Sequence, residues 1–573
     1  MGPAASRAGF DGPAELPRVY VKSSLADTPS PGHVINVNEG GNLREAINNA
    51  ECGDTITLQA GATFPGNFKF PAKKCDDGHW ITLRSGAPDS ALPREGTRIT
   101  PCYAGVASLP GRPDYHCTAP KNVMAKIVST GKGGGPFILS NGANHYRLIG
   151  LEVTRDTPGF IVYNLMMIEK DGVADHIVLD RVWFHGTPQD ETNRGISFGG
   201  SRYVAVVDSY FTDFHCTAIS GGCVDAQAIA GGTGSKPMGP YKIDNNFLEG
   251  AAETIIFGGG PATSAPADIE IRRNHMFKPL TWMPGNPQFV GGTDGHPFIV
   301  KNLFELKNAE RVLLDGNILE NVWGGFSQAG FGVLLTPKNQ MAMVGNVCPE
   351  CYVTDVTIRN CLIRHVASGF QIGNGVSGNG GVPKEGGRYS IHDVVVDDIQ
   401  PALYKGTGAF AQISTSAGVS DIPVLHDVQI DHVSAFPPKA LLIMGGPREG
   451  RRMNNLVITN SIFTSGEKPL LTTGGGPEKN CSAQPDRKGL KTVFDDCFVA
   501  YAFHHNVIVG SGDFPKGNTV LKKPSDIGLV NFQGGNGGDY HLAATSKFKH
   551  AATDGKDLGA DIDAIDKATE GVQ

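Results

Sequence analysis

The chain has 573 residues, which is long for one globular domain but within reach of a single all-β solenoid. Its 76 glycines are about twice average usage and only 19% of its residues are charged, a profile that favours a turn-rich β protein over a helical one. The net charge of −7 is mild, and the chain has no Lys/Arg run and no apolar run near the roughly 18 residues of a membrane span, so neither a nucleic-acid partner nor a membrane span is expected.

The N-terminal stretch 1–33 is expected to be an extended arm. It lacks the apolar core of about 7–15 residues that marks a signal peptide, so export is inferred from other features.

The cysteines are the main such feature. Ten of the eleven fall into pairs that are close in sequence, and Cys361 is left over. The pairs are Cys52/Cys75, Cys102/Cys117, Cys216/Cys223, Cys348/Cys351 and Cys481/Cys497. Local pairs suit disulfides that staple loops, which predicts an oxidising location, extracellular or periplasmic. The alternative is a set of buried thiols in a cytosolic protein.

The body of the chain opens with "NLREAINNAECGDTITLQAGATF" (42–64), which predicts a short amphipathic helix, a turn and a strand. Such a helix would cover the exposed end of a solenoid.

A repeated unit follows, in which an aliphatic run leads to a polar residue and then to two or three apolar residues. Examples are "HIVLDRVWFHG" (176–186), "RVLLDGNILEN" (311–321) and "NLVITNSIFTSG" (455–466). A second strand follows a Gly-rich turn in each unit, as in "GVLLTPKNQ" (332–340) and "GFQIGNG" (369–375). Alternation of period two throughout predicts an all-β fold, a single solenoid over 34–545 with long loops on one face and a C-terminal tail or cap over 546–573.

The polar residue of the unit is often asparagine, and we expect it to form an internal ladder that links one coil to the next. The markers are Asn245, Asn274, Asn317, Asn360, Asn460 and Asn506.

The opening helix with "GDTITLQAG" and the repeated "I..N.F" units resemble the right-handed parallel β-helix superfamily of pectate lyases and related proteins. The resemblance covers about residues 34–545 and implies that fold with an N-terminal capping helix. It also implies a carbohydrate-active protein, although the same body serves lyases, hydrolases, phage tailspikes and adhesins.

A groove is expected on the outer face of one sheet, because coils stack about 4.8 Å apart and matching side chains of neighbouring coils can act together. If Ile256, Phe304 and Leu335 point inward, alternation sends Glu305 and Thr336 outward, within about residues 250–375. The candidate catalytic residues are Lys307, Glu305, Lys301, Glu253 and Asp294. The candidate substrate contacts are Lys338, Asn339, His296, Arg273, Trp323 and Gln371.

Two reactions suit this set. The lysines favour β-elimination of an acidic polysaccharide, in which a base removes the proton α to a uronic carboxylate and a cation stabilises the developing charge. Glycoside hydrolysis is the alternative and would use a carboxylate pair such as Glu253 and Glu305. A third interpretation is a non-catalytic glycan-binding surface protein whose charges form only a solvated face.

The resemblance adds one match and two departures. Lys307 occupies the lysine position of alginate-lyase-like and chondroitinase-like β-helix lyases, whereas Asn302 stands at their metal-binding Glu position and Thr336 at their Arg position. Calcium is the only cofactor that the resemblance implies, and the residues themselves point to no metal ligand.

Overall fold

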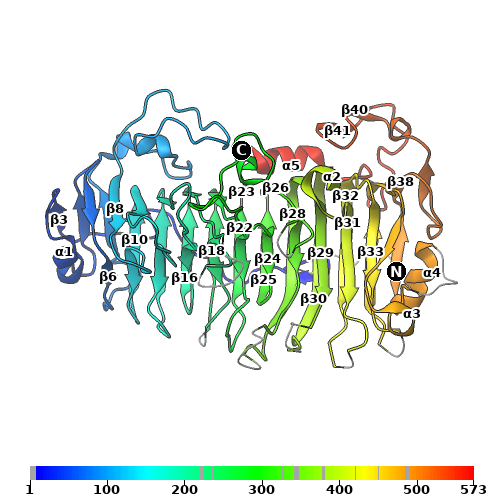
Figure 1. The fold of residues 1–573 in the computed structure, drawn as a ribbon, viewed down its shortest axis with the longest axis horizontal. Coiled ribbons are helices and arrows are strands. Elements are labelled where there is room, and N and C mark those ends of the chain that lie inside the picture. Colours follow the sequence, from blue (N-terminus) through cyan, green and yellow to red (C-terminus); the bar gives the residue numbers. More distant parts are fainter. Residues whose placement is uncertain are drawn as a thin grey trace. The chain divides into compact units, whose positions relative to one another are not determined.

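The computed structural model describes residues 8–573 except 218–222, 235–236, 326–327, 341–346, 377–380, 420, 449–450 and 484–488. The chain is mostly β and forms long parallel sheets, consistent with the parallel β-helix that the sequence predicts (Figure 1). It divides into two compact units. The first unit consists of Val19–Ile256, Pro266–Val300 and Val572–Gln573, and the second of Met1–Arg18, Phe257–Ala265 and Lys301–Gly571. The proposed limits of arm, body and tail stay a prediction.

The first unit contributes strands to two sheets. In the larger sheet it has β3 (Val34–Val37), β4 (Thr55–Leu58), β5 (Thr63–Pro65), β7 (Ile81–Ser85), β8 (Ala125–Ser129), β10 (Asn144–Ile149), β11 (Leu151–Arg155), β13 (Asp175–Asp180), β14 (Trp183–His185), β16 (Arg202–Val207), β17 (Tyr210–Thr212), β19 (Tyr241–Asp244), β20 (Phe247–Glu249), β22 (Ala267–Arg272) and β23 (His275–Phe277). In the smaller sheet it has β6 (Phe68–Phe70), β9 (Phe137–Leu139), β12 (Met166–Ile168), β15 (Arg194–Ser197), β18 (Gln227–Gly231) and β21 (Glu253–Phe257), whose last residue belongs to the second unit. Its helices are α1 (Leu43–Asn49) and the 3-10 turns η1 (Asp89–Ala91), η2 (Pro101–Tyr103) and η3 (Leu280–Trp282).

The second unit repeats this plan. Its larger-sheet strands are β25 (Ala309–Asp315), β26 (Ile318–Val322), β28 (Tyr352–Val366), β30 (Glu385–Ile399), β32 (His426–Ala435), β34 (Asn454–Thr459), β35 (Ile462–Thr464), β37 (Tyr501–His504), β38 (Val507–Val509) and β39 (Thr519–Leu521). Its smaller-sheet strands are β24 (Asn302–Leu306), β27 (Phe331–Leu335), β29 (Ser368–Asn374), β31 (Ala409–Thr415), β33 (Ala440–Gly445) and β36 (Leu470–Thr472). Two antiparallel pairs, β1 (Phe10–Asp11) with β2 (Ala14–Glu15) and β40 (Leu529–Phe532) with β41 (Gly538–Leu542), and the helices α2 (Pro401–Tyr404), α3 (Gly476–Lys479), α4 (Leu490–Cys497), η4 (Pro524–Ile527) and α5 (Ile562–Thr569) complete it.

Helix α1 forms where the sequence predicts a helix. The side chain of Asn42 accepts a hydrogen bond from the Glu45 backbone N–H and caps its N-terminus, and Leu43, Ala46 and Ile47 form its buried face. The helix contacts β3 and β6, and its role as a cap stays a prediction. Among the described residues, no helix combines the length and apolar character needed to cross a membrane.

The internal ladder exists but only part of the marker assignment is correct. Asn274 accepts from the backbone N–H of Asn246 (3.0 Å) and donates to the carbonyl of Ile243 (2.8 Å), and Asn506 likewise donates to the carbonyl of Ile458 (2.9 Å). Asn245, by contrast, has a left-handed backbone with φ of 57°, and the ladder residue is its neighbour Asn246.

Asn360 and Asn460 were also predicted as ladder residues, and each lies one residue before the ladder position. Both are left-handed, with φ of 52°, and the ladder position falls on Cys361 and Ser461. A left-handed residue reverses the direction of the chain at the corner of the coil, a task that Asn tolerates well. The period-two pattern does not distinguish this corner residue from the inward residue after it.

All five predicted disulfides are present, from Cys52–Cys75 to Cys481–Cys497. The eleventh cysteine, Cys361, is fully buried at its ladder position, and burial raises the pKa of its thiol to about 12. Its burial explains why one cysteine is left without a partner.

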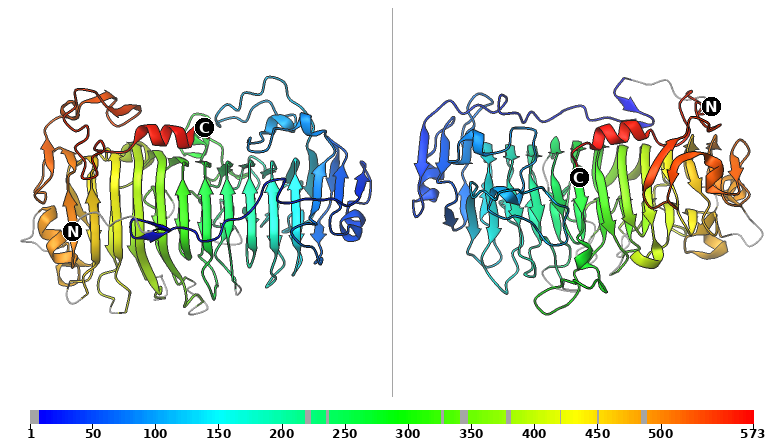
Figure 2. Two further views of the ribbon diagram at one scale, coloured as in Figure 1. Left: turned by 180° about the vertical axis from the view of Figure 1, so that it is seen from behind. Right: turned by 90° about the horizontal axis from the view of Figure 1, so that it is seen from above.

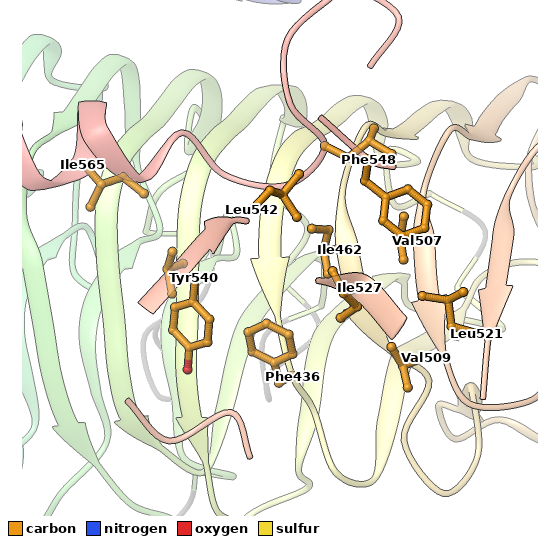
Figure 3. Packing of buried hydrophobic residues seen from close by; sticks show 12 residues of the cluster. Phe436, Ile462, Val507, Val509, Leu521, Ile527, Tyr540, Leu542, Phe548 and Ile565 are labelled. Carbon is orange, nitrogen blue, oxygen red and sulfur yellow. The ribbon is translucent and has the colours of Figure 1, made fainter. Parts of the chain in front are cut away.

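The C-terminal segment packs onto the larger sheet of the second unit. Figure 3 shows Tyr540, Leu542 and Phe548 against Phe436 and Ile462 in one apolar cluster. Farther along, α5 contacts β28 and β30, and Figure 2 shows it beside these strands in both views. The segment covers apolar side chains of β30, β35 and β38 that would otherwise meet water.

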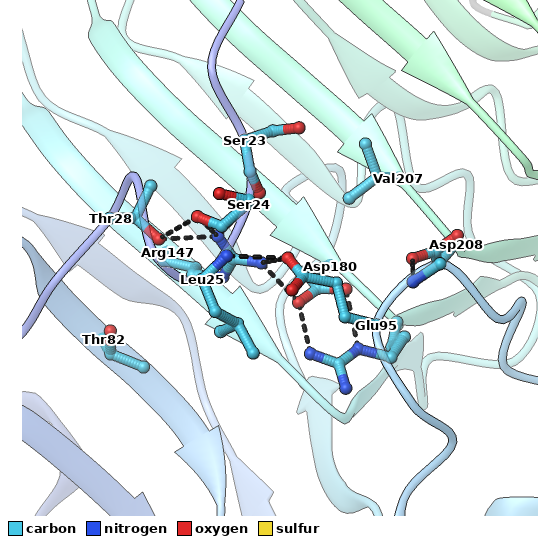
Figure 4. Close-up of polar contacts among 12 residues, drawn as sticks. Ser23, Ser24, Leu25, Thr28, Thr82, Glu95, Arg147, Asp180, Val207 and Asp208 are labelled. Atoms are coloured by element: carbon cyan, nitrogen blue, oxygen red, sulfur yellow. Dashed lines mark hydrogen bonds and ion pairs between the residues drawn. The ribbon is translucent and has the colours of Figure 1, made fainter.

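A buried ion cluster fastens the irregular segment 19–28 of the first unit to two coils (Figure 4). Arg147 on β10 donates to the Asp180 carboxylate on β13 at 2.6 Å and, through its other nitrogen, to Thr28 Oγ1 (2.6 Å) and the Ser23 carbonyl (2.8 Å). Arg181 donates to the same carboxylate at 2.8 Å. Arg147 is 1% exposed and Asp180 is fully buried, so each charge depends on its partner.

We therefore expect Asp180→Asn to lower the unfolding free energy of the first unit by about 3–5 kcal/mol, because two buried guanidinium groups lose their counter-charge. The midpoint of urea unfolding measures this loss. The control is Glu169→Gln, which removes an exposed pair with Lys69 (2.9 Å) and should shift the midpoint little. Equal shifts in the two variants would contradict the assigned role.

Within the second unit, the hairpin β1–β2 is fastened to β28 and β30 by a pH-sensitive contact. The Asp11 carboxylate accepts from Arg359 (3.0 Å) and pairs with His392 Nε2 (3.1 Å). Burial alone would lower the pKa of His392, but hydrogen bonds with Asp11 and Asp393 outweigh it and raise the pKa to about 9. Burial would likewise raise the pKa of Asp11, but His392 and Arg359 outweigh it and lower that pKa.

This contact predicts release of the hairpin at alkaline pH. The raised pKa of His392 contributes on the order of 2 kcal/mol below about pH 6.5, and this contribution is lost as the pH rises through about 9. Hydrogen exchange of residues 8–18, corrected for the intrinsic effect of pH, should therefore accelerate between pH 7 and 9.5. His392→Gln should exchange fast and independently of pH, and retention of the pH step in that variant would assign it to another group.

Candidate functional site

The outer face of the smaller sheet in the second unit carries the candidate groove. Strand register aligns Glu305, Leu334, Gln371, Gln412 and Ile443 in one row across β24, β27, β29, β31 and β33. The neighbouring positions Phe304 and Leu306 are fully buried, as alternation along a strand requires. Each outward side chain is thus one coil away from its counterpart in the row.

Two adjoining hollows lie along this face. The first, here called the lysine hollow, has a volume of about 280 Å³ and is lined by Glu305, Lys307, Gln328, Leu334, Thr336, Lys338, Gln340, Gln371 and Val376. The second, the amide hollow, has a volume of about 350 Å³ and is lined by Thr336, Lys338, Gln371, Gly373, Asn374, Gly375, Gln412, Ser414, Thr415, Ser416, Ala417, Thr473, Gly474 and Gly475. Thr336, Lys338 and Gln371 line both, so the hollows form one polar groove.

Glu305 is the only carboxylate among the described residues that line the two hollows, and it is 2% exposed. One of its oxygens lies 3.3 Å from Lys307 Nζ, and the other accepts from Asn302 Nδ2 at 3.0 Å. A buried carboxylate held in this way fixes the position of the ammonium beside it.

Lys338 approaches the same hollow from the segment after β27. Burial lowers the pKa of its ammonium, the nearby charge of Lys307 lowers it further, and Glu305 opposes the shift. Its Nζ donates to the Val376 carbonyl at 3.3 Å and passes so close to Gly375 that a Cβ there would lie 2.5 Å from it. The absence of a side chain at Gly375 therefore leaves the room that the ammonium occupies.

The residues around Glu305 do not fit calcium. Calcium takes about 6–8 oxygen ligands, usually with several carboxylates. Among the described residues that line the hollow, one carboxylate is present, it is engaged by Lys307 and Asn302, and two ammonium groups lie beside it. Asn302 stands where similar lyases have a metal-binding Glu, and the structure agrees with the loss of that ligand. The Lys307 ammonium lies beside Glu305, where a bound metal would need further negative charge.

Four predicted site residues come together in the lysine hollow, namely Glu305, Lys307, Lys338 and Gln371. Lys301 precedes β24, is 9% exposed and does not line either hollow.

Two further predicted contacts are structural. Asn339 is 2% exposed, accepts from the Cys348 backbone N–H (2.9 Å) and donates to the Val382 carbonyl (3.3 Å), so its amide braces a loop. Trp323 is 3% exposed and has no ring face to offer a sugar.

The remaining predicted residues belong to the first unit. Glu253 is fully buried on β21, where it accepts from Gln227 at 2.7 Å. Asp294 and His296 form an exposed pair at 2.6 Å on a loop. Arg273 occupies a left-handed corner between β22 and β23 of the larger sheet, away from the smaller sheet.

Sequence reasoning missed the polar half of the groove. Gln412, Ser414 and Ser416 alternate along "FAQISTSAG" (410–418) and line the amide hollow with Thr473. The available signal was the pairing of Gln371 with Gln412 at the same position of successive coils, which places two amides side by side on the outer face.

The groove is suited to an anionic, hydroxyl-rich ligand. It offers two ammonium groups at one end and a row of amides and hydroxyls at the other, and no aromatic side chain occurs among its described lining residues. A lowered pKa increases the fraction of an amine that is neutral and able to accept a proton, while a carboxylate beside a second amine favours its charged form.

No family model matches the chain, and no curated protein matches it in sequence. Solved structures with a similar fold include a mannuronic-acid-specific polysaccharide lyase of family 6 from human gut microbiota, at 11% identity and a TM-score of 0.48, covering 86% of this chain and 92% of that one. Others are pectate lyase Pel9A (11% identity, TM-score 0.34, 93% and 97% covered) and the catalytic domain of GH87 alpha-1,3-glucanase in complex with nigerose (10%, 0.48, 85% and 70%). At these identities the likeness does not extend to activity or substrate.

Proposed function

We propose that the protein is an exported carbohydrate-active enzyme that cleaves an acidic polysaccharide by β-elimination in the groove over β24–β33. The observation that carries the proposal is the lysine hollow, where Lys338, with its lowered pKa, lies beside the charged pair of Lys307 and Glu305. The five disulfides support an oxidising location, extracellular or periplasmic.

In the proposed reaction Lys338, as the neutral amine, takes the proton on the carbon α to a uronate carboxylate. Lys307 pairs with that carboxylate and stabilises the charge that develops on it. The electron pair of the broken C–H bond forms the new carbon–carbon double bond, the bond to the glycosidic oxygen breaks, and water protonates the leaving oxygen. Glu305 acts as a positioning residue through Lys307.

Glycoside hydrolysis is less well supported in this groove. That reaction needs two carboxyl groups on either side of the bond, whereas Glu305 is the only one among the described lining residues and is already engaged by Lys307. Glu253, the proposed partner, is buried and bonded to Gln227.

A panel of uronic-acid and neutral glycans tests the reaction class. Elimination predicts products that absorb in the ultraviolet, because the new double bond is conjugated with the carboxylate. New reducing ends without that absorbance would indicate hydrolysis, and binding without products would indicate a glycan-binding protein.

Paired lysine variants test the roles. Lys338→Arg cannot lose its proton and should reduce kcat by about 10²–10⁴-fold, whereas Lys307→Arg keeps its charge and should lose less. The rate should rise with pH up to the lowered pKa of Lys338, below the ordinary lysine value, and Lys338→Arg should abolish that rise. Equal losses in the two Arg variants would contradict the division of labour.

Gly375→Ala tests the position of Lys338 without changing a charge. Its Cβ would displace the Lys338 ammonium, so activity should fall at unchanged thermal stability. The matched control is Gly474→Ala in the same groove, since a Cβ there meets nothing within 4 Å. Full activity of Gly375→Ala would show that the ammonium need not stay in this place.

A further inference from the structure

A stack of aromatic rings stands on consecutive coils of the first unit, on the larger sheet. The register of β10 with β13 places His145 opposite His176, and both occupy left-handed corners with φ of 55° and 53°. Their imidazole rings are parallel within 5° at 4.5 Å, and Tyr203 of the next coil continues the stack at 4.5 Å. Left-handed corners recur along the chain, so the fold itself brings the side chains of successive corners together. At this place two successive corners are both histidine.

Nδ1 of each imidazole ring already contacts the side chain of the preceding residue. The Asn144 amide donates to the carbonyls of Lys73 (2.6 Å) and Gly142 (2.9 Å), which turns its oxygen toward His145 Nδ1 at 2.9 Å. That nitrogen must therefore carry the proton. His176 Nδ1 lies in ion-pair contact with the carboxylate of Asp175. In a neutral His145 ring the lone pair is then left on Nε2.

Both Nε2 atoms face one carboxylate. Asp77 Oδ1 lies 3.2 Å from Nε2 of His145 and 3.8 Å from Nε2 of His176. His145 Nε2 can meet this carboxylate in two ways, as the N–H donor of a protonated ring or, in the neutral ring, through a cation bound by its lone pair and the carboxylate. An acceptor group on a histidine's second nitrogen is also the arrangement that usually supports a histidine bound to a metal.

The loop that carries Asp77 is held in place on both sides. The disulfide Cys52–Cys75 fixes it two residues earlier, and Trp80, which is 2% exposed, packs edge-on against both imidazoles at 5.0 Å and 6.0 Å. Asp77 itself is 84% exposed, which leaves its carboxylate free to move onto an ion that arrives from solvent.

We propose that Asp77, His145 and His176 form a binding site for a divalent transition ion of the zinc class. Their ligand atoms all lie within 4.8 Å of one another. Two imidazole nitrogens and one carboxylate oxygen are a typical zinc set with water in the fourth place, whereas calcium and magnesium prefer oxygen ligands alone. The ion would fasten the disulfide-stapled loop to two coils, independently of the groove chemistry.

Calorimetric titration of chelator-treated, tag-free protein with Zn²⁺ tests the site, with one equivalent bound per chain as the expected result. His145→Ala and His176→Ala should each weaken binding at least tenfold. Asp77→Asn should weaken it as well, and because this side chain is exposed the variant tests the site even where the histidine variants fold poorly. Substitution with Co²⁺ should give the visible absorption of a four-coordinate site, lost in the same variants.

His504→Ala is the control. His504 and His505 form another adjacent pair, with their Nδ1 atoms 2.9 Å apart, but among the described residues no carboxylate lies close enough to form a three-ligand set with them. It should bind Zn²⁺ as the unchanged chain does. Absence of stoichiometric binding, or binding by Asp77→Asn and His145→Ala that is as tight as that of the unchanged chain, would overturn the proposal and leave the stack as a packing feature.

Discussion

The parallel pairing of successive coils is the constraint on which the rest of the structure depends. Backbone hydrogen bonds hold each strand in register with the next, so that a side chain one coil on stands about 4.8 Å away and on the same face. This single relation places Gln371 beside Gln412 in the groove, Asn246 beside Asn274 in the interior and His145 beside His176 at the corner. The fold therefore places equivalent positions of successive coils in rows. A candidate site forms where the residues of one row have polar or ionisable side chains.

The lysine hollow shows how such a row becomes reactive. A lone lysine on an outer face would be fully solvated and charged, but Lys338 lies where burial and a second ammonium both disfavour its charge. Glu305 keeps the second ammonium in place and limits the repulsion between the two. The arrangement gives two identical side chains different surroundings, since burial lowers the pKa of Lys338 whereas Glu305 pairs with Lys307.

Alternation along the strands predicted the fold and one side of the groove. Once Phe304 and Leu335 are read as inward, Glu305 and Lys307 must point outward, and the structure places them so. Loop residues escaped this reasoning, because Asn339 and Trp323 have no strand to define their direction, and both are buried.

The corners set another limit on sequence reasoning. Asn245 and Asn460 have the residue type of the ladder but adopt the left-handed turn just before it, a distinction that depends on one backbone dihedral angle. Gln412 and Ser414 were overlooked for the opposite reason, since short polar residues on an outer strand face are ordinary until their neighbours one coil away are known.

The disulfides join cysteines 23, 15, 7, 3 and 16 residues apart, always the next available partner along the chain. A chain that is oxidised from its N-terminus onward would thus complete each native bridge before the following pair emerges, and would need no later exchange of partners. Cys361 is the one thiol that could interfere, and it enters the chain after four bridges are closed. Its place inside the coil removes it from solvent as soon as that coil forms. Order of synthesis, together with the burial of Cys361, can therefore specify the correct pairing.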